Sequence, residues 1–502
     1  MLDWIARIAA PFEESKAPIA YFFGGFIFWI WLRTLIEAFV FQFDMGALMM
    51  VHFTLSYLSL VLWMALTVGV FAGRNPIKVL RLMLVAYVFV LLAPTLDFII
   101  QDPIQYTIAY INQVPLDELG RRYLTFFGPL EAEGITPGMR IEIALVLCMT
   151  SVYILAQSRS VVRMVLGAIA SWTVIFFHCA YLTVMPTLAA LLRLNYTEDP
   201  VTGNQLYCLL CCLASLGIVA RGAREQFWAV FKDTRFLRVL HYELLFALGL
   251  AFAKPPRHFD FGDFIATVVV FVAVWLGWTF AVMSNNYYDI EADRINAPER
   301  PLVAGAMDPE AYLKLSFWIF ALALTLALSA SFLSLFFVAM CGIAYFIYSA
   351  PPLRLKARWQ VSKVAIGINS VCCVFAGYCL WSKTMLTIPL LPIGLILVGF
   401  TMGAHVIDLK DVKGDEASGI KNLVTMLGLR RAQRVLGAFV GTGHLGFFAF
   451  TYDVWFGWAA GVAGIAQWIA ITRERYRDSA VLIIQDAMLA CAVVFVWQMP
   501  VT

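Results

Sequence analysis

The sequence predicts an all-α integral membrane protein with about fifteen transmembrane helices. Of its 502 residues, 62% are hydrophobic and only 14% are charged, whereas charged residues make up about 25% of an average soluble domain. Apolar stretches of roughly 17 to 25 residues, each long enough to cross a bilayer, recur along the whole chain. They are too long and too uniformly apolar for barrel strands, so we expect every one to satisfy its backbone polar groups as a helix.

The first six predicted spans form an N-terminal membrane domain, residues 1–220, in which no motif predicts an activity. Arg33 and Glu37 lie four residues apart within its first span, where an ionisable side chain is a candidate for a functional role. Because that spacing puts both side chains on one face of a helix, we favour a structural ion pair over a functional site. The predicted spans are residues 20–42, 47–71, 79–100, 141–157, 162–190 and 205–220.

A basic, amphipathic segment, residues 221–236, follows these spans. Its Trp228, Phe231 and basic side chains suit a cytoplasmic linker lying on the anionic membrane surface, and a calmodulin-like partner is the alternative. Residues 237–502 then form a C-terminal domain with nine further spans. These spans are residues 237–253, 264–284, 313–330, 332–349, 361–381, 386–407, 432–451, 455–472 and 479–499.

Charge predicts the orientation of the spans, because cytoplasmic loops collect Lys and Arg. With the N-terminus inside and every span crossing, all strongly basic loops lie in the cytoplasm and the C-terminus lies outside. These loops are residues 221–238, 354–363, 421–434 and 473–477. The small net charge of +3 follows from this bias, so we expect no nucleic-acid partner. We expect the protein to lie in the cell (inner) membrane.

Two charged motifs interrupt the apolar pattern of the C-terminal domain, both at cytoplasmic ends of spans. Each contains three oxygen-bearing side chains at spacings of three or four residues, which place them on one face of a helix. The first motif is Asn285, Asp289 and Asp293, and the second motif is Asp408, Asp411 and Asp415. Either motif alone could be a solvated interfacial loop, but two motifs at matching depth on one side of the membrane favour a shared site.

The residue types in these motifs indicate magnesium and a diphosphate. Hard divalent cations such as Mg²⁺ take oxygen ligands and bridge protein carboxylates to substrate phosphates. Carboxylates gathered at a bilayer edge would repel one another unless cations joined them. Two such faces pointing toward each other could hold metal ions and one diphosphate, and the metals would stabilise a departing pyrophosphate.

The two motifs and the loop between them resemble those of the UbiA superfamily of intramembrane prenyltransferases. The resemblance rests on both motifs together with Asn296, Arg300, Pro301, Leu302, Gly419, Lys421 and the stretch YSAPPLRLK at residues 348–356. That stretch is similar to the family's short loop after its fourth helix. The resemblance covers roughly residues 235–500, about half of the chain.

The resemblance implies a nine-helix bundle around a central cavity, with both motifs at its cytoplasmic mouth and a lateral opening for the isoprenoid tail. It implies Mg²⁺ as the cofactor, bound by the five Asp side chains and by Asn285. The implied diphosphate-binding residues are Arg300, Lys356 and Lys421. Tyr348 would face the cavity near the reacting carbon, or belong to a structural aromatic belt.

One position departs from the family pattern. Many members carry Asp directly after the first Asn, where this chain has Asn286. An amide still offers an oxygen to a metal but removes one negative charge, so the metal affinity of the first motif is in question. His405, three residues before Asp408, is a candidate base, although we favour a packing role.

The predicted function is magnesium-dependent transfer of a prenyl group from an isoprenoid diphosphate to an aromatic or lipid acceptor within the membrane, with release of pyrophosphate. Cyclisation of the isoprenoid, or transfer of a sugar phosphate to a polyprenyl phosphate, would use the same metal chemistry. The non-enzymatic alternative is a lipid-binding or assembly protein with a relict transferase fold. The presence of five carboxylates in the motifs argues against that alternative.

Overall fold

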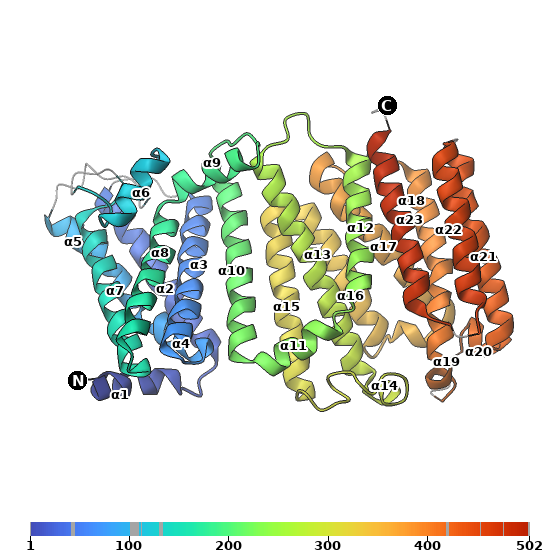
Figure 1. Ribbon diagram of the computed structural model, residues 1–502, viewed down its shortest axis with the longest axis horizontal. Coiled ribbons are helices and arrows are strands. Elements are labelled where there is room, and N and C mark those ends of the chain that lie inside the picture. The colour runs from blue at the N-terminus through green and yellow to red at the C-terminus, as the bar shows by residue number, and fades with distance from the viewer. Residues whose placement is uncertain are drawn as a thin grey trace. The chain divides into compact units, whose positions relative to one another are not determined.

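The computed structural model describes residues 2–41, 46–100, 110–111, 113–129, 134–417, 421–451, 453–474 and 476–499. All regular structure within these ranges is helical (Figure 1), and fourteen helical segments are long and apolar enough to cross a membrane. The predicted all-α membrane fold is therefore confirmed. The chain divides into two compact units, one comprising Met1–Arg224 with Asp260–Ile265 and the other Glu225–Phe259 with Ala266–Thr502.

Unit 1 contains six of the membrane-spanning segments, as predicted. Its helices are α1 (Leu2–Glu13), α2 (Ile19–Phe41), α3 (Ala47–Ala72), α4 (Pro76–Ala86), η1 (Tyr87–Leu91), α5 (Leu92–Ile100), α6 (Leu116–Leu124), α7 (Pro137–Ser158), α8 (Val161–Cys179), α9 (Tyr181–Leu191) and α10 (Pro200–Gly222). The prediction of one span over 162–190 is wrong, because α8 ends at Cys179 and α9 is a separate, short helix. A single helix of that length would be about 44 Å long, well beyond a hydrocarbon core of about 30 Å.

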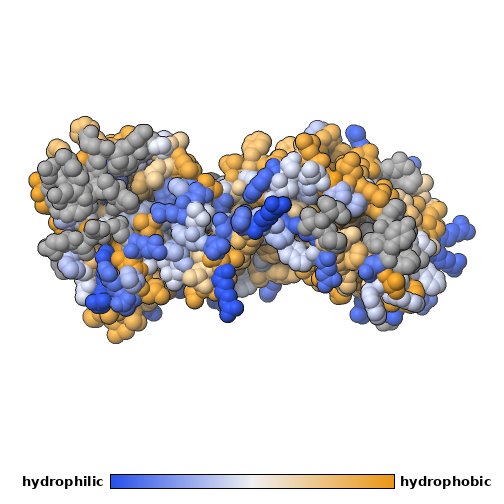
Figure 2. All heavy atoms as spheres, turned by 90° about the horizontal axis from the view of Figure 1, so that it is seen from above, coloured by the Kyte–Doolittle hydropathy of each residue, from blue (hydrophilic) through white to orange (hydrophobic). Residues whose placement is uncertain are grey.

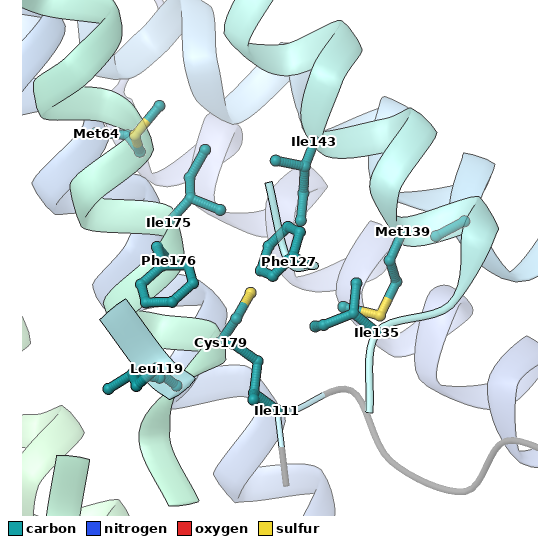
Figure 3. Packing of buried hydrophobic residues seen from close by; sticks show 12 residues of the cluster. Met64, Ile111, Leu119, Phe127, Ile135, Met139, Ile143, Ile175, Phe176 and Cys179 are labelled. Carbon is teal, nitrogen blue, oxygen red and sulfur yellow. The ribbon is translucent and has the colours of Figure 1, made fainter. Parts of the chain in front are cut away.

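A buried apolar cluster holds the helices of unit 1 to the segments that connect them. Figure 3 shows Phe127 and Ile135 from the connection before α7 meeting Phe176 and Cys179 of α8. Phe127 and Phe176 are each only 1% exposed. The chain between α5 and α7 is thus tied down by side-chain burial at its described ends.

An ion-pair cluster lies inside the membrane-spanning part of unit 1. Arg33 is 1% exposed and pairs with Glu37 at 2.9 Å and with Glu142 of α7 at 3.2 Å. Its guanidinium also donates to the Val90 carbonyl at 3.2 Å and lies over the ring of Tyr57. The sequence predicted the pair with Glu37, but Glu142 joins only through helix packing.

We expect Arg33→Met to lower the free energy of unfolding by about 3 to 5 kcal/mol, because it leaves two buried carboxylates without their cation. Thermal unfolding in detergent would measure this loss. A variant that also carries Glu37→Gln and Glu142→Gln should recover much of it, since neutral amides need no counterion. An Arg33→Met protein that unfolds at the wild-type temperature would contradict this assignment.

Among the described residues, unit 2 contains nine long helices, at the positions of the nine predicted spans, although the first residues of α13 (Phe261–Tyr288), residues 261–265, belong to unit 1. Its helices are α11 (Arg224–Asp233, beginning at the boundary), α12 (Phe236–Ala253), α13 (Phe261–Tyr288), α14 (Ile290–Asn296), α15 (Pro309–Ala330), α16 (Phe332–Ser349), η3 (Leu355–Ala357), α17 (Trp359–Ser382), α18 (Leu390–Gly403), η4 (Ala404–Ile407), α19 (Asp408–Ala417), α20 (Leu423–Leu427), α21 (Leu429–Thr451), α22 (Val454–Thr472) and α23 (Asp478–Gln498). α21 has the length of a span but is less apolar than the fourteen, because Arg430, Arg431 and Arg434 occupy its first two turns.

Six helices of unit 2 form a closed ring. α12 packs against α17 and α23, and the ring continues from α23 through α22, α21 and α18 back to α17. α12 and α17 approach most closely at Gly249 and Gly377, where an added Cβ would lie 2.0 Å and 2.1 Å from a backbone carbonyl oxygen of the other helix. Glycine permits this approach because it has no Cβ. The close contact holds together two helices that line the site described below.

The outer faces of the helices are apolar. In each unit, hydrophobic side chains run along the flanks while hydrophilic ones gather on the end face (Figure 2). On α22, for example, Trp455 and Trp458 are 84% and 70% exposed. Large apolar side chains exposed on this scale are expected where the surrounding solvent is lipid rather than water.

Candidate functional site

One cavity of unit 2, of about 180 Å³, gathers nearly all of the predicted site residues. We call it the polar cavity. Its lining includes Asn285, Asp289, Asp293, Arg300, Tyr348, Lys356, Asp408, Asp411 and Lys421. Asp415 belongs to α19, and its side chain lies outside the described part of the structure. The two motifs, over a hundred residues apart in the sequence, therefore face one space, and α14 packs directly against α19.

The first motif is built on a helix break. α13 ends at Tyr288, and Asp289 adopts φ −112° and ψ 12° before α14 begins at Ile290. The expected single helical face is thus corrected to two helix ends, which still turn all three side chains toward the cavity. Asn285 Oδ1 accepts a hydrogen bond from Ser349 Oγ at 3.0 Å, which ties α13 to the end of α16.

Basic side chains pair with both carboxylates of the first motif. Lys356 Nζ, in the loop after α16, donates to Asp289, and Arg354 lies 3.9 Å from the same carboxylate. Arg300 pairs with Asp293. Burial raises the pKa of the Asp293 carboxyl, and the positive charge of Arg300 opposes that rise. Two of the predicted diphosphate-binding residues therefore contact the predicted metal ligands.

The second motif begins where the α18 helix changes form. The chain passes from α18 through the 3₁₀ turn η4 into α19, whose first residue is Asp408. Lys363 of α17 donates to Asp408 Oδ1 at 2.5 Å. Asp408 Oδ2 is buried and has no hydrogen-bond partner among the described residues. A buried, unpaired carboxylate oxygen is costly unless a cation or donor meets it.

Several basic side chains of the polar cavity were missed by sequence reasoning. Lys363, Arg235, Arg238 and Lys410 all line the polar cavity. Lys363 carried a usable signal, because it is an ionisable residue inside a predicted span. Arg235 and Arg238 lie in a basic segment that was assigned only to the membrane surface or to a cytoplasmic loop, and Lys410 lies within the second motif, so nothing in their spacing separated them from solvated charges.

The candidate role of His405 as a base finds no support in the lining of the cavities. His405 is 8% exposed and lines neither the polar cavity nor the adjoining one. Its Nδ1 is buried and has no hydrogen-bond partner among the described residues. These observations agree with a packing role.

The polar cavity is cationic overall. Eight basic side chains line it, against four carboxylates whose positions are described. Within the described ranges, no three Asp, Glu, His or Cys side chains form a cluster that could hold a metal ion. Asp289, Asp293 and Asp408 are each paired with a Lys or Arg side chain. Oxygen donors from two helices in one cavity, one of them unpartnered at Asp408, nonetheless fit a hard cation such as Mg²⁺.

A second, apolar cavity of about 320 Å³ adjoins the polar one. The ring of six helices encloses it, and each of the six contributes to its lining. Arg238, Tyr242, Ile366 and Ile407 line both cavities. The pair of cavities is complementary to an amphiphile with an anionic head and an apolar tail.

Comparisons with known proteins identify relatives of unit 2. Residues 244–498 match the UbiA prenyltransferase family. The chain is 34% identical over 172 residues to digeranylgeranylglyceryl phosphate synthase of Thermococcus gammatolerans, an alignment that covers 34% of this chain and 60% of that protein. It is 30% identical over 159 residues to the chloroplastic chlorophyll synthase of Arabidopsis thaliana, covering 30% of this chain and 40% of that protein. The chain thus spans about three-fifths or less of the length of these curated relatives.

Solved structures give a weaker similarity. A UbiA homolog from Archaeoglobus fulgidus bound to GPP and Mg²⁺ aligns with 54% of this chain and 100% of its own chain, at 18% identity and a TM-score of 0.42.

Proposed function

Because the chain belongs to the UbiA prenyltransferase family, we propose that it transfers a prenyl group from an isoprenoid diphosphate to an acceptor within the membrane and releases pyrophosphate. The observation that supports this most strongly is the pair of joined cavities, one lined by both motifs and many cations, the other apolar. A diphosphate head and an isoprenoid chain require these two environments side by side.

The side chains of the polar cavity would have two roles, metal binding by the carboxylates and Asn285 and phosphate binding by the basic residues. Asn285, together with the five Asp residues of the two motifs, would hold Mg²⁺, which when bound supplies positive charge that stabilises the departing pyrophosphate. Arg300, Lys356 and Lys421 would donate to phosphate oxygens, as the sequence analysis predicted, and Lys363 would join them. Cations fixed in place before the reaction stabilise developing negative charge without the cost of reorienting solvent.

The apolar cavity would bind the isoprenoid chain and keep water out. An allylic cation formed beside water would be captured by water, so exclusion of solvent directs it to the acceptor. Tyr348 lines the polar cavity, in keeping with a place near the reacting carbon. The names of the relatives point to different products, so we propose the acceptor only at the level of a membrane-soluble aromatic or lipid molecule.

The orientation follows from the distribution of charge. We propose that the motifs face the cytoplasm and that the protein lies in the cell membrane, because the basic loops around them obey the positive-inside pattern. We also propose three sequence regions: an N-terminal membrane domain over 1–220, a basic linker over 221–236 and the transferase domain over 237–502.

We expect the purified chain to convert a labelled isoprenoid diphosphate, in the presence of membrane extract as a source of acceptor, into a lipid-soluble prenylated product and pyrophosphate. Chromatography and mass spectrometry of the product would separate this outcome from the alternatives. A product formed without any acceptor would indicate cyclisation, and transfer of a sugar phosphate to polyprenyl phosphate would indicate the third enzymatic reaction. Tight binding without turnover would support the relict lipid-binding protein.

A further inference from the structure

The amide of Asn286 is fully used by the protein. The side chain is 1% exposed and does not line the polar cavity. Its Nδ2 donates to the Asp233 carboxylate and to the Tyr312 hydroxyl, the latter at 3.2 Å. Its Oδ1 accepts from Arg235 Nη2 at 3.2 Å. Asn286 is therefore a structural hub behind the first motif, and its oxygen is not presented to the cavity.

Two partners of Asn286, Asp233 and Arg235, come from the segment that precedes α12, whereas Tyr312 lies on α15. Asp233 is the last residue of α11, and Arg235 holds a left-handed φ of +58° just before α12 begins. Between them, the Thr234 carbonyl accepts a hydrogen bond at 2.9 Å from the indole of Trp278 on α13. Three consecutive residues, which we call the 233–235 clamp, are thus attached to the helix that carries the first motif.

Arg235 of the 233–235 clamp brings a positive charge to the polar cavity. Arg235 lines the polar cavity together with Arg238 and Arg300. Burial, together with the nearby charges of Arg300 and Arg238, lowers the pKa of the Arg235 guanidinium to about 10. Burial also raises the pKa of the Asp233 carboxyl. Cations crowded together in this way are stabilised when an anion enters the space between them.

We propose that the 233–235 clamp is a working part of the active site: Asp233 and Asn286 form a carboxylate–amide pair that holds Arg235 in the polar cavity, where its guanidinium binds the diphosphate of the prenyl donor. The role of Arg235 rests on the proposed function, whereas the pair stands on contacts alone. Asp233 and Asn286 are positioning residues, and Arg235 is a substrate-binding residue.

The pair requires one carboxylate and one amide, in either order. The substitution Asn286→Asp would place a second carboxylate in hydrogen-bonding contact with Asp233, and the two charges would repel. With the two residues exchanged, the amide now at position 233 would donate to the carboxylate now at position 286. Arg235 would still meet an oxygen acceptor there. The exchange therefore keeps the number of charges and the hydrogen bonds of position 286 with position 233 and with Arg235, while the Tyr312 hydroxyl would donate to the new carboxylate instead of accepting from the amide. Either single substitution changes the number of charges.

The experiment compares Asn286→Asp with the double variant Asp233→Asn/Asn286→Asp in the full-length protein. We expect the single variant to unfold at a lower temperature and the double variant to return most of the way to the wild-type midpoint. We also expect the KM for the prenyl diphosphate to rise at least about tenfold in the single variant and to fall again in the double variant. If the double variant is no better than the single one in both measurements, the paired arrangement is refuted.

Arg235→Ala tests the anion-binding role. It should raise both the KM for the prenyl diphosphate and the Kd for inorganic pyrophosphate at least about tenfold, with a smaller effect on kcat. Arg235→Lys should recover part of the loss. The matched control is Lys232→Ala, because Lys232 is a nearby, exposed cation that does not line the cavity. Unchanged pyrophosphate binding in Arg235→Ala would overturn the assignment.

The unfolding midpoints and the pyrophosphate affinities distinguish a failure of this proposal from a failure of the proposed function. If the wild-type protein turns over no isoprenoid diphosphate, the proposed function fails. The unfolding midpoints still decide the pair, and pyrophosphate binding still decides Arg235. If the wild-type protein is active and these variants behave like it, only the clamp fails.

Discussion

Asp411→Ala is expected to lower prenyl transfer at least about a hundredfold while the protein still folds. Asp411 lines the polar cavity, and no ion pair or hydrogen bond joins its carboxylate to another described side chain. Its removal therefore breaks no structural contact, in contrast to Asp289, whose loss would strand Lys356. The effect should fall on turnover, because a ligand for the cation at the diphosphate is lost.

Glu416→Ala is the matched control for this substitution. Glu416 is an exposed carboxylate on the same helix, α19, and does not line the polar cavity. Initial rates with a labelled isoprenoid diphosphate, together with the unfolding midpoint in detergent, would measure both properties. Activity of Asp411→Ala within about twofold of the control would remove the second motif from the chemistry.

Removal of divalent metal should reduce turnover to background. Lys356, Arg300 and Lys363 each pair with one carboxylate of the polar cavity, so these side chains alone offer little net positive charge to the phosphate oxygens. We expect a chelator titration to abolish product formation, and excess Mg²⁺ to restore it. The Kd for inorganic pyrophosphate should rise in parallel, which provides a readout independent of turnover.

The control for this experiment is the same chelator already saturated with Mg²⁺, which should leave the rate unchanged. Full activity after exhaustive chelation and dialysis would show that Lys and Arg alone neutralise the diphosphate. That result would overturn the assignment of the two motifs as metal ligands.

The membrane fold could be predicted because each span consists of consecutive apolar residues. Hydropathy depends only on local sequence, so the nine positions of unit 2 and the six of unit 1 were accessible. The errors occur where a helix that was predicted to be continuous breaks, at Cys179 in an apolar run and at Asp289 in the first motif. The positions of these breaks depend on the thickness of the hydrocarbon core of the membrane and on side-chain packing around each break. Amino-acid composition does not encode either of these directly.

The candidate site was predictable only in part. The carboxylates of the two motifs repeat at helical spacings, so they could be named from the residues themselves. Lys356 was named only through the resemblance of its loop to that of the family. Arg235 and Lys363 reach the cavity from other helices, and their contributions depend on how α12 and α17 pack. The apolar cavity is lined by ordinary Leu, Ile, Val and Phe residues among others, which cannot be told from core residues until the ring of helices closes.

The four residues shared by both cavities set a boundary with a chemical consequence. Arg238, Tyr242, Ile366 and Ile407 line both cavities and so mark the boundary between charged and apolar surroundings. Under the proposed function, a donor with its head in one cavity and its tail in the other would place its scissile carbon–oxygen bond near these four residues. Side chains here would therefore govern the face from which a nucleophile approaches, and hence product stereochemistry, independently of how long the tail is.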